Sequence, residues 1–171
     1  MATLEIVKYT EPVLHTIGKP VERFDEELER LVNDMFETMY AAKGVGLAAP
    51  QVGVSSRLFV MDVPNEASES NKIAVVNPEI IYVEGEQIGD EGCLSFPGLY
   101  IKIQRNMRAI VRGQDVAGDW FELDGVELTA RCILHETDHC DGIVFLDRMT
   151  KLRREMAKRK IKRLQKTGKW E

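Results

Sequence analysis

His135-Glu136-Thr137-Asp138-His139 is the stretch of sequence from which the rest of this chain can be interpreted. Residues four apart lie on one face of a helix, so the imidazoles of His135 and His139 can reach the same metal ion. Glu136 directly follows the first histidine, where its carboxylate can act as a general base toward water. The stretch therefore predicts a helix at the centre of the fold and metal-assisted hydrolysis of a carbonyl compound.

A hydrolytic metal site of this kind uses three protein ligands and keeps one position open. In one class of protease the third ligand is a histidine six residues after the second, where this chain has Phe145, which cannot bind a metal. In another class a downstream glutamate completes the site, but the nearest one, Glu155, lies in a strongly basic segment. Both protease patterns therefore lack a ligand.

The remaining candidates for the third ligand are three cysteines, Cys93, Cys132 and Cys140. Cys140 adjoins His139 and points about 100° away around the helix, which predicts a core position. Cys132 lies seven residues before His139, about 10 Å along the helix axis, too far to share one metal with both histidines. Cys93 has no such restriction, and we expect Gly92 and Pro97 to break regular structure around it and fix the direction of its thiolate. Cys93 is therefore the predicted third ligand.

The pattern of apolar residues predicts an α+β fold, with mixed or antiparallel strands packed around a central metal-binding helix and followed by a C-terminal helix. Asp25 is the expected N-cap of a first helix that ends near residues 43–44, and Thr150 is the expected N-cap of the last. Asn77-Pro78 should separate two short strands, and Asp124-Gly125 should open the central helix. Strands are predicted at residues 57–63, 73–76, 79–83, 100–104, 107–112 and 120–123. The last helix should pack on the body through Leu152, Met156, Ile161 and Leu164.

Three segments stand in order along the chain: Gly44-Val45-Gly46-Leu47-Ala48-Ala49-Pro50-Gln51, Glu91-Gly92-Cys93-Leu94-Ser95, and His135-Glu136-Thr137-Asp138-His139-Cys140-Asp141-Gly142. Together they closely resemble the three signature segments of peptide deformylases, and the resemblance covers almost the whole chain. It implies a metal-dependent hydrolase that removes the N-formyl group from the N-terminal formyl-methionine of nascent polypeptides and releases formate. It also implies that the metal ligands are Cys93, His135 and His139.

The resemblance implies roles for further residues. Glu136 is the expected catalytic acid and base. The side-chain amide of Gln51 and the main-chain N–H of Leu94 are the expected donors to the oxyanion that forms when water attacks the formyl carbon. A narrow apolar pocket should accept the unbranched methionine side chain, and the residues expected to line it are Val45, Leu128, Cys132 and the ring edge of His135. Gly46 is expected to let the substrate backbone approach closely.

The predicted ligands do not by themselves determine which metal ion is bound. A thiolate with two imidazoles suits Fe(II), Zn(II), Ni(II) and Co(II), and the resemblance implies Fe(II) in cells, with the other ions in purified protein. We expect Glu91 and Arg131 to pair beside the site. Two other functions remain open, a metallopeptidase and a non-catalytic partner-binding module with a structural metal. The missing third histidine or glutamate disfavours the first, and the second would need neither Glu136 nor Gln51.

The size and composition of the chain indicate one domain that does not enter a membrane. A chain of 171 residues can bury a substantial core. It has no apolar run near the roughly 18 residues of a membrane span, and residues 1–10 lack the features of a signal peptide. Without an export signal, the three cysteines are expected to be reduced thiols, which predicts a cytoplasmic protein.

The net charge of −5 conceals a strong asymmetry. Residues 148–171 contain 11 Lys or Arg and 2 Glu, whereas the preceding residues carry a net charge of −14. We expect residues 1–149 to form the catalytic body and residues 150–171 a basic helix and tail of the same domain. An acidic body with a basic tail suggests a polyanionic partner, and the expected partner is the ribosome, without sequence-specific recognition of nucleic acid.

Overall fold

The computed structural model describes residues 2–64 and 71–168, so residues 169–171 of the predicted tail lie outside it. In this part of the chain an antiparallel sheet has the strand order β1-β2-β3-β6-β7, and β4 and β5 form a separate two-stranded sheet. The strands are β1 (Gly46–Ala48), β2 (Leu58–Asp62), β3 (Lys72–Glu84), β4 (Gln87–Cys93), β5 (Phe96–Arg105), β6 (Arg108–Gln114) and β7 (Trp120–Val126). The helices are α1 (Glu26–Ala41), α2 (Leu128–Cys140) and α3 (Lys151–Lys166), with short 3-10 helices η1 (Pro12–His15), η2 (Ala49–Val52) and η3 (Phe145–Arg148).

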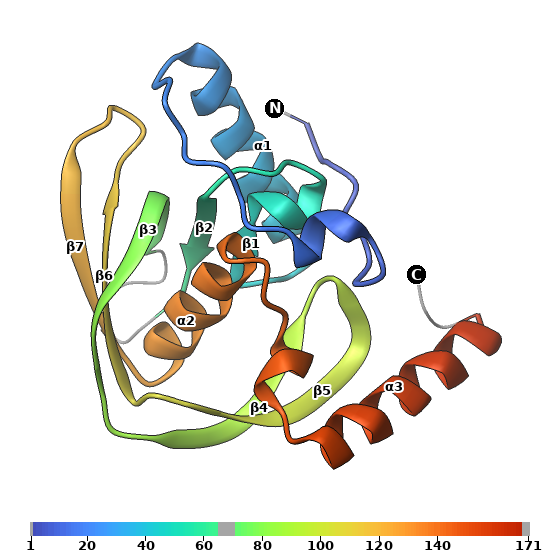
Figure 1. Ribbon diagram of the computed structural model, residues 1–171. Helices are drawn as coiled ribbons and strands as arrows, with labels where there is room; N and C mark the ends of the chain where they lie inside the picture. Colours follow the sequence, from blue (N-terminus) through green and yellow to red (C-terminus); the bar gives the residue numbers. More distant parts are fainter. Residues whose placement is uncertain (1, 65–70, 169–171) are drawn as a thin grey trace.

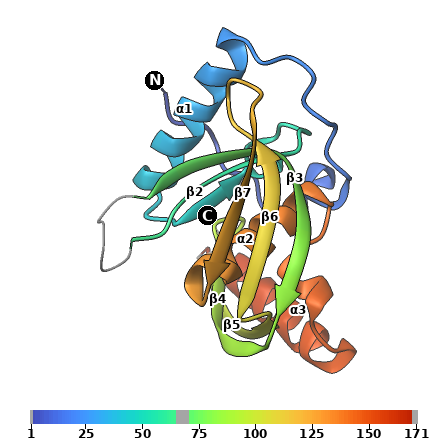
Figure 2. The ribbon, with the colours of Figure 1, turned by 90° about the vertical axis from the view of Figure 1, so that its left-hand side faces the viewer.

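Helix α2 lies at the centre of the molecule, between the five-stranded sheet and the β4–β5 hairpin (Figures 1 and 2). Its apolar residues Ala130, Ile133 and Cys140 pack in one core cluster with the inward-facing residues of the sheet. Strand β2 is buried on both faces, because Phe59 packs in the cluster of α2 and Leu58 in that of α1. The predicted α+β fold around a central helix, with a C-terminal helix, is confirmed.

The prediction that Asp124-Gly125 opens the central helix is wrong. Both residues belong to β7, where Gly125 pairs with Ala109 of β6, and the helix begins at Leu128. A Cβ atom on Gly125 would lie 2.6 Å from the side chain of Thr129. Glycine at position 125 therefore allows β7 to approach the following helix closely, and it does not mark the start of that helix.

The prediction of two short strands separated by Asn77-Pro78 is also wrong, because β3 runs through both residues. Its pairing with β6 shifts between Val76 and Glu79, and Asn77 has a φ of 52°. The side-chain amide of Asn77 donates to the main-chain oxygen of Val21, and its oxygen accepts from the main-chain N–H of the same residue. These hydrogen bonds stabilise a β-bulge. At such a bulge the missing N–H of a proline removes no hydrogen bond between the strands.

Sequence reasoning missed β4, and its prediction that Gly92 and Pro97 break regular structure around Cys93 is wrong in part. Gly92 lies in β4 opposite Tyr100, and Pro97 lies in β5. The ring of Tyr100 covers Gly92 so closely that a Cβ atom there would be 2.5 Å from the ring. The register of the pairing between β4 and β5 shifts between Gly92 and Cys93. The residues around Pro97 therefore lie in an irregular part of the hairpin. Cys93 is thus the last residue of a strand, and the β4–β5 turn fixes its position.

Both predicted N-caps are confirmed, since Asp25 accepts from the N–H of Leu28 and Thr150 from that of Arg153. Helix α1 ends at Ala41, two residues before the predicted end. For α3 the predicted packing is wrong in part, because Leu152 and Met156 are 72% and 60% exposed. The residues of α3 that are buried are Ala157 and Ile161, which pack in a cluster with residues of β5 and η3.

Candidate active site and metal centre

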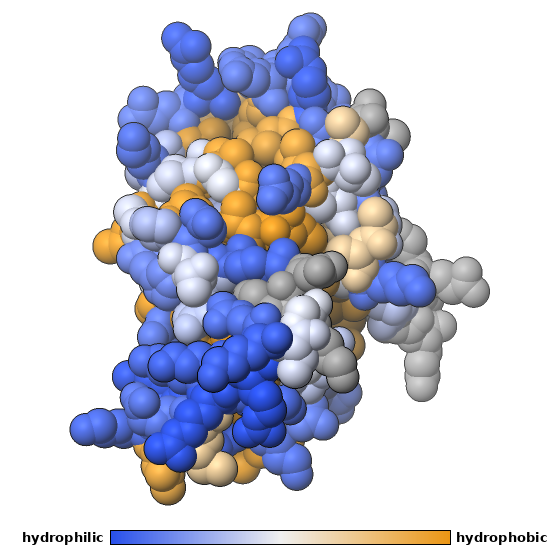
Figure 3. All heavy atoms as spheres, turned by 90° about the vertical axis from the view of Figure 1, so that its right-hand side faces the viewer, coloured by the Kyte–Doolittle hydropathy of each residue, from blue (hydrophilic) through white to orange (hydrophobic). Residues whose placement is uncertain are grey.

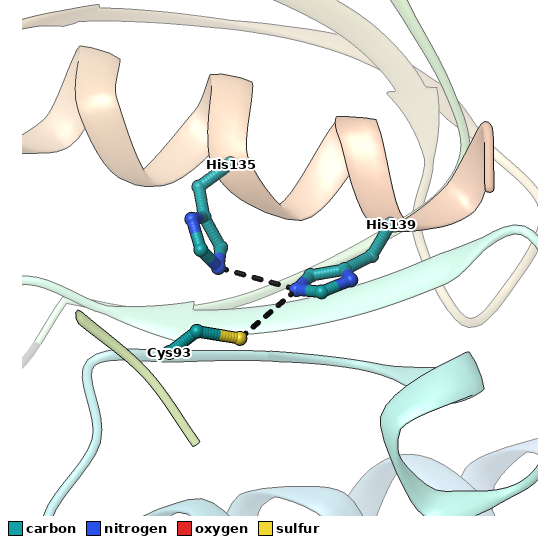
Figure 4. Close-up of side chains that lie close together, drawn as sticks. All are labelled: Cys93, His135 and His139. Atoms are coloured by element: carbon teal, nitrogen blue, oxygen red, sulfur yellow. Dashed lines mark hydrogen bonds between the residues drawn. The ribbon is translucent and has the colours of Figure 1, made fainter. Parts of the chain in front are cut away.

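Helix α2 and the end of β4 bring together three side chains that could bind a metal ion. The ligand atoms of Cys93, His135 and His139 all lie within 4.8 Å of one another. The Nε2 atom of His139 is 3.4 Å from the Cys93 sulfur and 3.2 Å from Nε2 of His135 (Figure 4). Ligands bound at 2.0–2.3 Å around a tetrahedral ion have separations of this order. The donor set and its spacing therefore fit a divalent metal, with a fourth position left for water or substrate.

The second nitrogen of His135 is held by a buried carboxylate. Its Nδ1–H donates to Glu91 at 2.6 Å, which leaves Nε2 free to bind a metal. Burial opposes ionisation of Glu91, but hydrogen bonds from Arg105 and His135 keep its pKa well below the usual range. The expected pairing of Glu91 with Arg131 is present at 3.0 Å. Glu91 is therefore a carboxylate that fixes the orientation of the His135 ring.

Sequence reasoning missed two charged residues of this network, Arg105 and Asp138. Arg105 donates to both oxygens of Glu91 and, through Nη1, to Asp138 at 2.7 Å. Arg105 follows Ile101 and Ile103 on the inward side of β5, and an arginine at such a position needs a buried carboxylate. The alternation of inward- and outward-facing residues along this strand could have identified Arg105 as buried. The predicted strand stopped at residue 104, so Arg105 was left out.

The Glu136 carboxylate is buried in a different environment. It is 4% exposed, and its Oε1 atom has no hydrogen-bond partner among the described residues. Burial raises the pKa of Glu136 to about 7, although the neighbouring His135 acts in the opposite direction. A Cβ atom on Gly46 would lie 2.6 Å from Oε2 of Glu136 and 2.8 Å from the Cys132 sulfur. Glycine at position 46 thus makes room for this carboxylate.

The candidate oxyanion donors lie beside the Cys93 ligand. Gln51 is 1% exposed in η2, and its oxygen accepts from the main-chain N–H of Ala48 at 2.9 Å. This bond turns the amide nitrogen toward the Cys93 sulfur, 3.5 Å away, and toward Ser95. Leu94 directly follows Cys93 in the β4–β5 turn. Both candidates therefore lie at the metal centre.

A cleft of about 650 Å³ opens onto these groups. Val45 and Leu128 are 39% and 50% exposed in its wall, whereas Cys132 is almost fully buried in it. The cleft is bordered by all of the predicted substrate-binding residues, Val45, Gly46, Leu128 and Cys132, and by His135, Gln51, Leu94 and Glu136. Sequence reasoning assigned no cleft role to Ile6, Lys8 or Tyr100, which also line it. The N-terminal segment reaches the cleft only through tertiary pairing, such as the bond from the N–H of Val7 to Gln51.

The other two cysteines do not join the metal-binding group. Cys140 is fully buried in the core, as predicted, and burial raises the pKa of its thiol to about 12. Burial, with the nearby Glu136, also raises the pKa of the Cys132 thiol. The Cys132 sulfur lies 3.7 Å from the main-chain oxygen of Val45, and both residues line the cleft. Both side chains are therefore neutral thiols at neutral pH.

Helix α2 carries two histidines and a glutamate whose Oε1 atom has no hydrogen-bond partner among the described residues, and Cys93, His135 and Glu136 line the cleft. With a cysteine beside both histidines, this arrangement is that of a metal-dependent hydrolase. None of the helices that the structure describes combines the length and apolar composition needed to cross a bilayer.

Comparison with known proteins identifies the family. The model of the polypeptide deformylase family matches residues 3–155. The chain is 49% identical to a peptide deformylase of Acidobacterium capsulatum, over 96% of this chain and 97% of the relative, and 47% identical to one of Chromobacterium violaceum, over 97% and 98%. Among solved structures, a peptide deformylase from Legionella pneumophila superposes with a TM-score of 0.89 at 46% identity, covering 98% of both chains. One from Ehrlichia chaffeensis superposes with a TM-score of 0.90 at 36% identity, covering 98% of this chain and 99% of the other.

The chain belongs to the peptide deformylase family, whose members are metallohydrolases that remove the N-formyl group from nascent peptides. The family assignment and the hydrolase function expected from the three sequence segments are confirmed. The metallopeptidase and the non-catalytic binding module are thereby set aside.

Proposed function

We propose that Cys93, His135 and His139 hold the catalytic metal, Fe(II) in cells, and that Glu136 transfers the protons during hydrolysis of the formyl–nitrogen bond. The observation that carries this proposal is the Glu136 carboxylate, buried in the cleft beside three converging ligand atoms and unpartnered at Oε1 among the described residues. A structural metal site would need no such group, because an unpaired buried carboxylate destabilises the fold.

The residues around the cleft account for each step of the reaction. When bound, a divalent ion supplies Lewis-acid chemistry that lets water attack a carbonyl carbon at neutral pH. Glu136 accepts a proton from the attacking water and then delivers it to the departing amine nitrogen. The products are formate and a peptide with a free N-terminus. The side-chain N–H of Gln51 and the main-chain N–H of Leu94 stabilise the charge that develops on the formyl oxygen.

We also propose that the cleft selects methionine at the N-terminus of the substrate. Cys132 forms its buried apolar wall, and Val45 and Leu128 form its more exposed part. Gly46 leaves the main chain accessible beside Glu136, so a substrate backbone can approach the carboxylate closely. A flexible thioether side chain can adapt its rotamers to such a cleft at little cost.

The decisive experiment follows two products from one substrate. Protein loaded with Fe(II) under anaerobic conditions is incubated with formyl-Met-Ala-Ser, and formate and free amino acids are measured together. Formate should appear while the peptide bonds stay intact. Release of amino acids without formate would contradict the proposed reaction. Metal analysis of anaerobically isolated protein tests the ion, and zinc in place of iron would contradict the Fe(II) assignment.

The basic helix α3 supports a proposal about where the enzyme acts. It forms the outer part of a strongly hydrophilic region on one face of the molecule (Figure 3). It has buried contacts through Ala157 and Ile161, which supports treating residues 150–171 as part of the same domain as residues 1–149. We propose that its exposed cations dock on ribosomal RNA phosphates, close to the emerging substrate. The three free thiols support a reducing, cytoplasmic location.

A further inference from the structure

Four charged side chains connect the protein surface with His135. The Nδ1–H of His135 donates to Glu91 at 2.6 Å, and Arg105 donates to the two oxygens of Glu91 at 2.9 and 2.7 Å. Arg105 also donates through Nη1 to Asp138 at 2.7 Å. Asp138 in turn accepts from Nη2 and Nε of Arg148, at 2.6 and 3.0 Å. The path runs from η3, just before the basic helix, to a proposed metal ligand.

The inner part of this path is removed from solvent. The side chains of Glu91, Arg105 and Asp138 are 4%, 5% and 9% exposed, whereas that of Arg148 is 46% exposed. Buried charges are stable only when their partners hold good geometry, and removal of one partner leaves the others uncompensated. The position of each inner group therefore depends in part on the next group outward, and Glu91 has Arg131 as a further partner at 3.0 Å.

The contact of Arg148 differs from an ordinary surface ion pair. It reaches both oxygens of a buried carboxylate, which fixes the plane of that carboxylate as well as its position. Oδ2 of Asp138 is the atom that Arg148 shares with Arg105. Without Arg148, Asp138 would keep one cationic partner and could rotate, and Arg105 would lose its fixed second anchor.

We propose that Arg148 is a positioning residue that holds the His135 imidazole in its ligand orientation through Asp138, Arg105 and Glu91. This inference rests on the proposed role of His135 as a metal ligand. Arg148 is not among the residues that line the cleft, and its guanidinium donates to Asp138, so its loss should lower kcat and hasten metal release without changing KM. Changes to outer partners of metal ligands typically cost 10–100-fold in metal affinity or activity, and a residue this far removed should lie near the lower end, about tenfold.

The test compares Arg148→Met with Arg148→Lys and Arg154→Met. Lysine can restore one of the two contacts with Asp138. Arg154 is a matched control, because its guanidinium donates to the main-chain oxygens of Leu146 in η3 and of Met149 directly after it, and to no carboxylate of the path. Two readouts apply to each variant: the rate at which bound Zn(II) passes to a chelator, and the NMR signal of the His135 Nδ1 proton in protein labelled with ¹⁵N-histidine. The chain contains 3 histidines, so this signal can be assigned.

Arg148→Met should release Zn(II) about tenfold faster and shift the His135 proton signal, Arg148→Lys should restore part of both, and Arg154→Met should match wild type. Equal Zn(II) release and an unchanged proton signal in Arg148→Met would overturn the proposal. So would equal effects of Arg148→Met and Arg154→Met, because these would indicate a role in anchoring η3. If addition of Zn(II) leaves the His135 signals of the wild-type protein unchanged, the proposed ligand set itself is wrong. That result is distinct from a failure of the proposed role of Arg148.

Discussion

Helices α2 and α3 are both rich in charged and polar residues, yet α2 lies inside the protein and α3 on its surface. Ten of the 13 residues of α2 are buried, among them Arg131, Asp138 and both histidines. In α3, of 16 residues, the buried ones are Ala157 and Ile161. The difference lies in the partners: the charges of α2 meet Glu91 and Arg105 from the β4–β5 hairpin, whereas the cations of α3 outnumber the acids near them. Buried polarity is thus tolerated where a second element supplies the complement.

The largest effect should come from Glu136, the α2 carboxylate whose Oε1 atom has no hydrogen-bond partner among the described residues. Glu136→Gln keeps the size of the side chain but removes the proton acceptor, so kcat for formyl-Met-Ala-Ser should fall by about 10²–10⁴-fold. The fold and the metal content should be retained. The matched change in α3, Glu155→Gln, affects an exposed side chain and should leave kcat unchanged. A Glu136→Gln variant with nearly full activity would contradict the proton-transfer role.

The next effect concerns the ligand that the hairpin contributes to α2. Cys93→Ser removes a thiolate that we assign to the metal, and its cost should exceed that of changing an outer partner, at about 100-fold or more in metal affinity. Cys132→Ser should keep the metal, because its sulfur is not part of the ligand group. Metal analysis after dialysis against a chelator measures both. Retention of metal by Cys93→Ser together with its loss in Cys132→Ser would show the assignment to be wrong.

A smaller effect is expected from the buried contact of α3. Ile161→Ala should lower the free energy of unfolding by about 2 kcal/mol, near the low end for such truncations, because α3 packs at the edge of the body. The control Leu152→Ala removes a side chain that is 72% exposed, and its effect should stay within about 0.5 kcal/mol. Urea denaturation compares the two variants. Equal losses would mean that the exposed side of α3 also packs against the body.

The cleft wall opposite α2 should tune affinity rather than chemistry. Val45→Phe should fill part of the space beside Cys132 and raise KM for formyl-Met peptides by about tenfold. A change of this size is comparable with the effect of one methylene group in an apolar substrate pocket. The decisive measurement is the separate determination of kcat and KM. An unchanged KM would remove Val45 from the methionine pocket.

The smallest effect on chemistry should come from the cations of α3. Reversal of charge at three exposed positions, Arg159→Glu, Lys162→Glu and Lys166→Glu, should weaken ribosome binding and reduce its dependence on salt, because fewer counterions are released. Hydrolysis of a free tripeptide should not change. Equal ribosome binding by wild type and variant at low salt would leave α3 with a packing role alone.

Much of the site could be predicted from sequence because its parts are local. The spacing of His135 and His139 places them on one helical face in any α-helix, and Cys93 followed from the lack of any other third ligand. The register of the strands around Cys93 could not be predicted, because glycine and proline, which stand at positions 92 and 97, are typical of loops. Their place in a hairpin depends on the ring of Tyr100 over Gly92 and on the pairing shift at Cys93.

By itself, the sequence determined the class of fold, the helix that carries the histidines, the caps at Asp25 and Thr150, and the family. These depend on local spacing and on short segments that keep their meaning wherever the chain places them. Beyond the expected pair of Glu91 and Arg131, the tertiary structure decided which charges are buried and which are solvated. Glu91, Arg105 and Asp138 come from three different elements, and Arg148 from a fourth. Each becomes stable in the interior only when folding brings the others within hydrogen-bonding distance, and no local pattern in the chain encodes that distance.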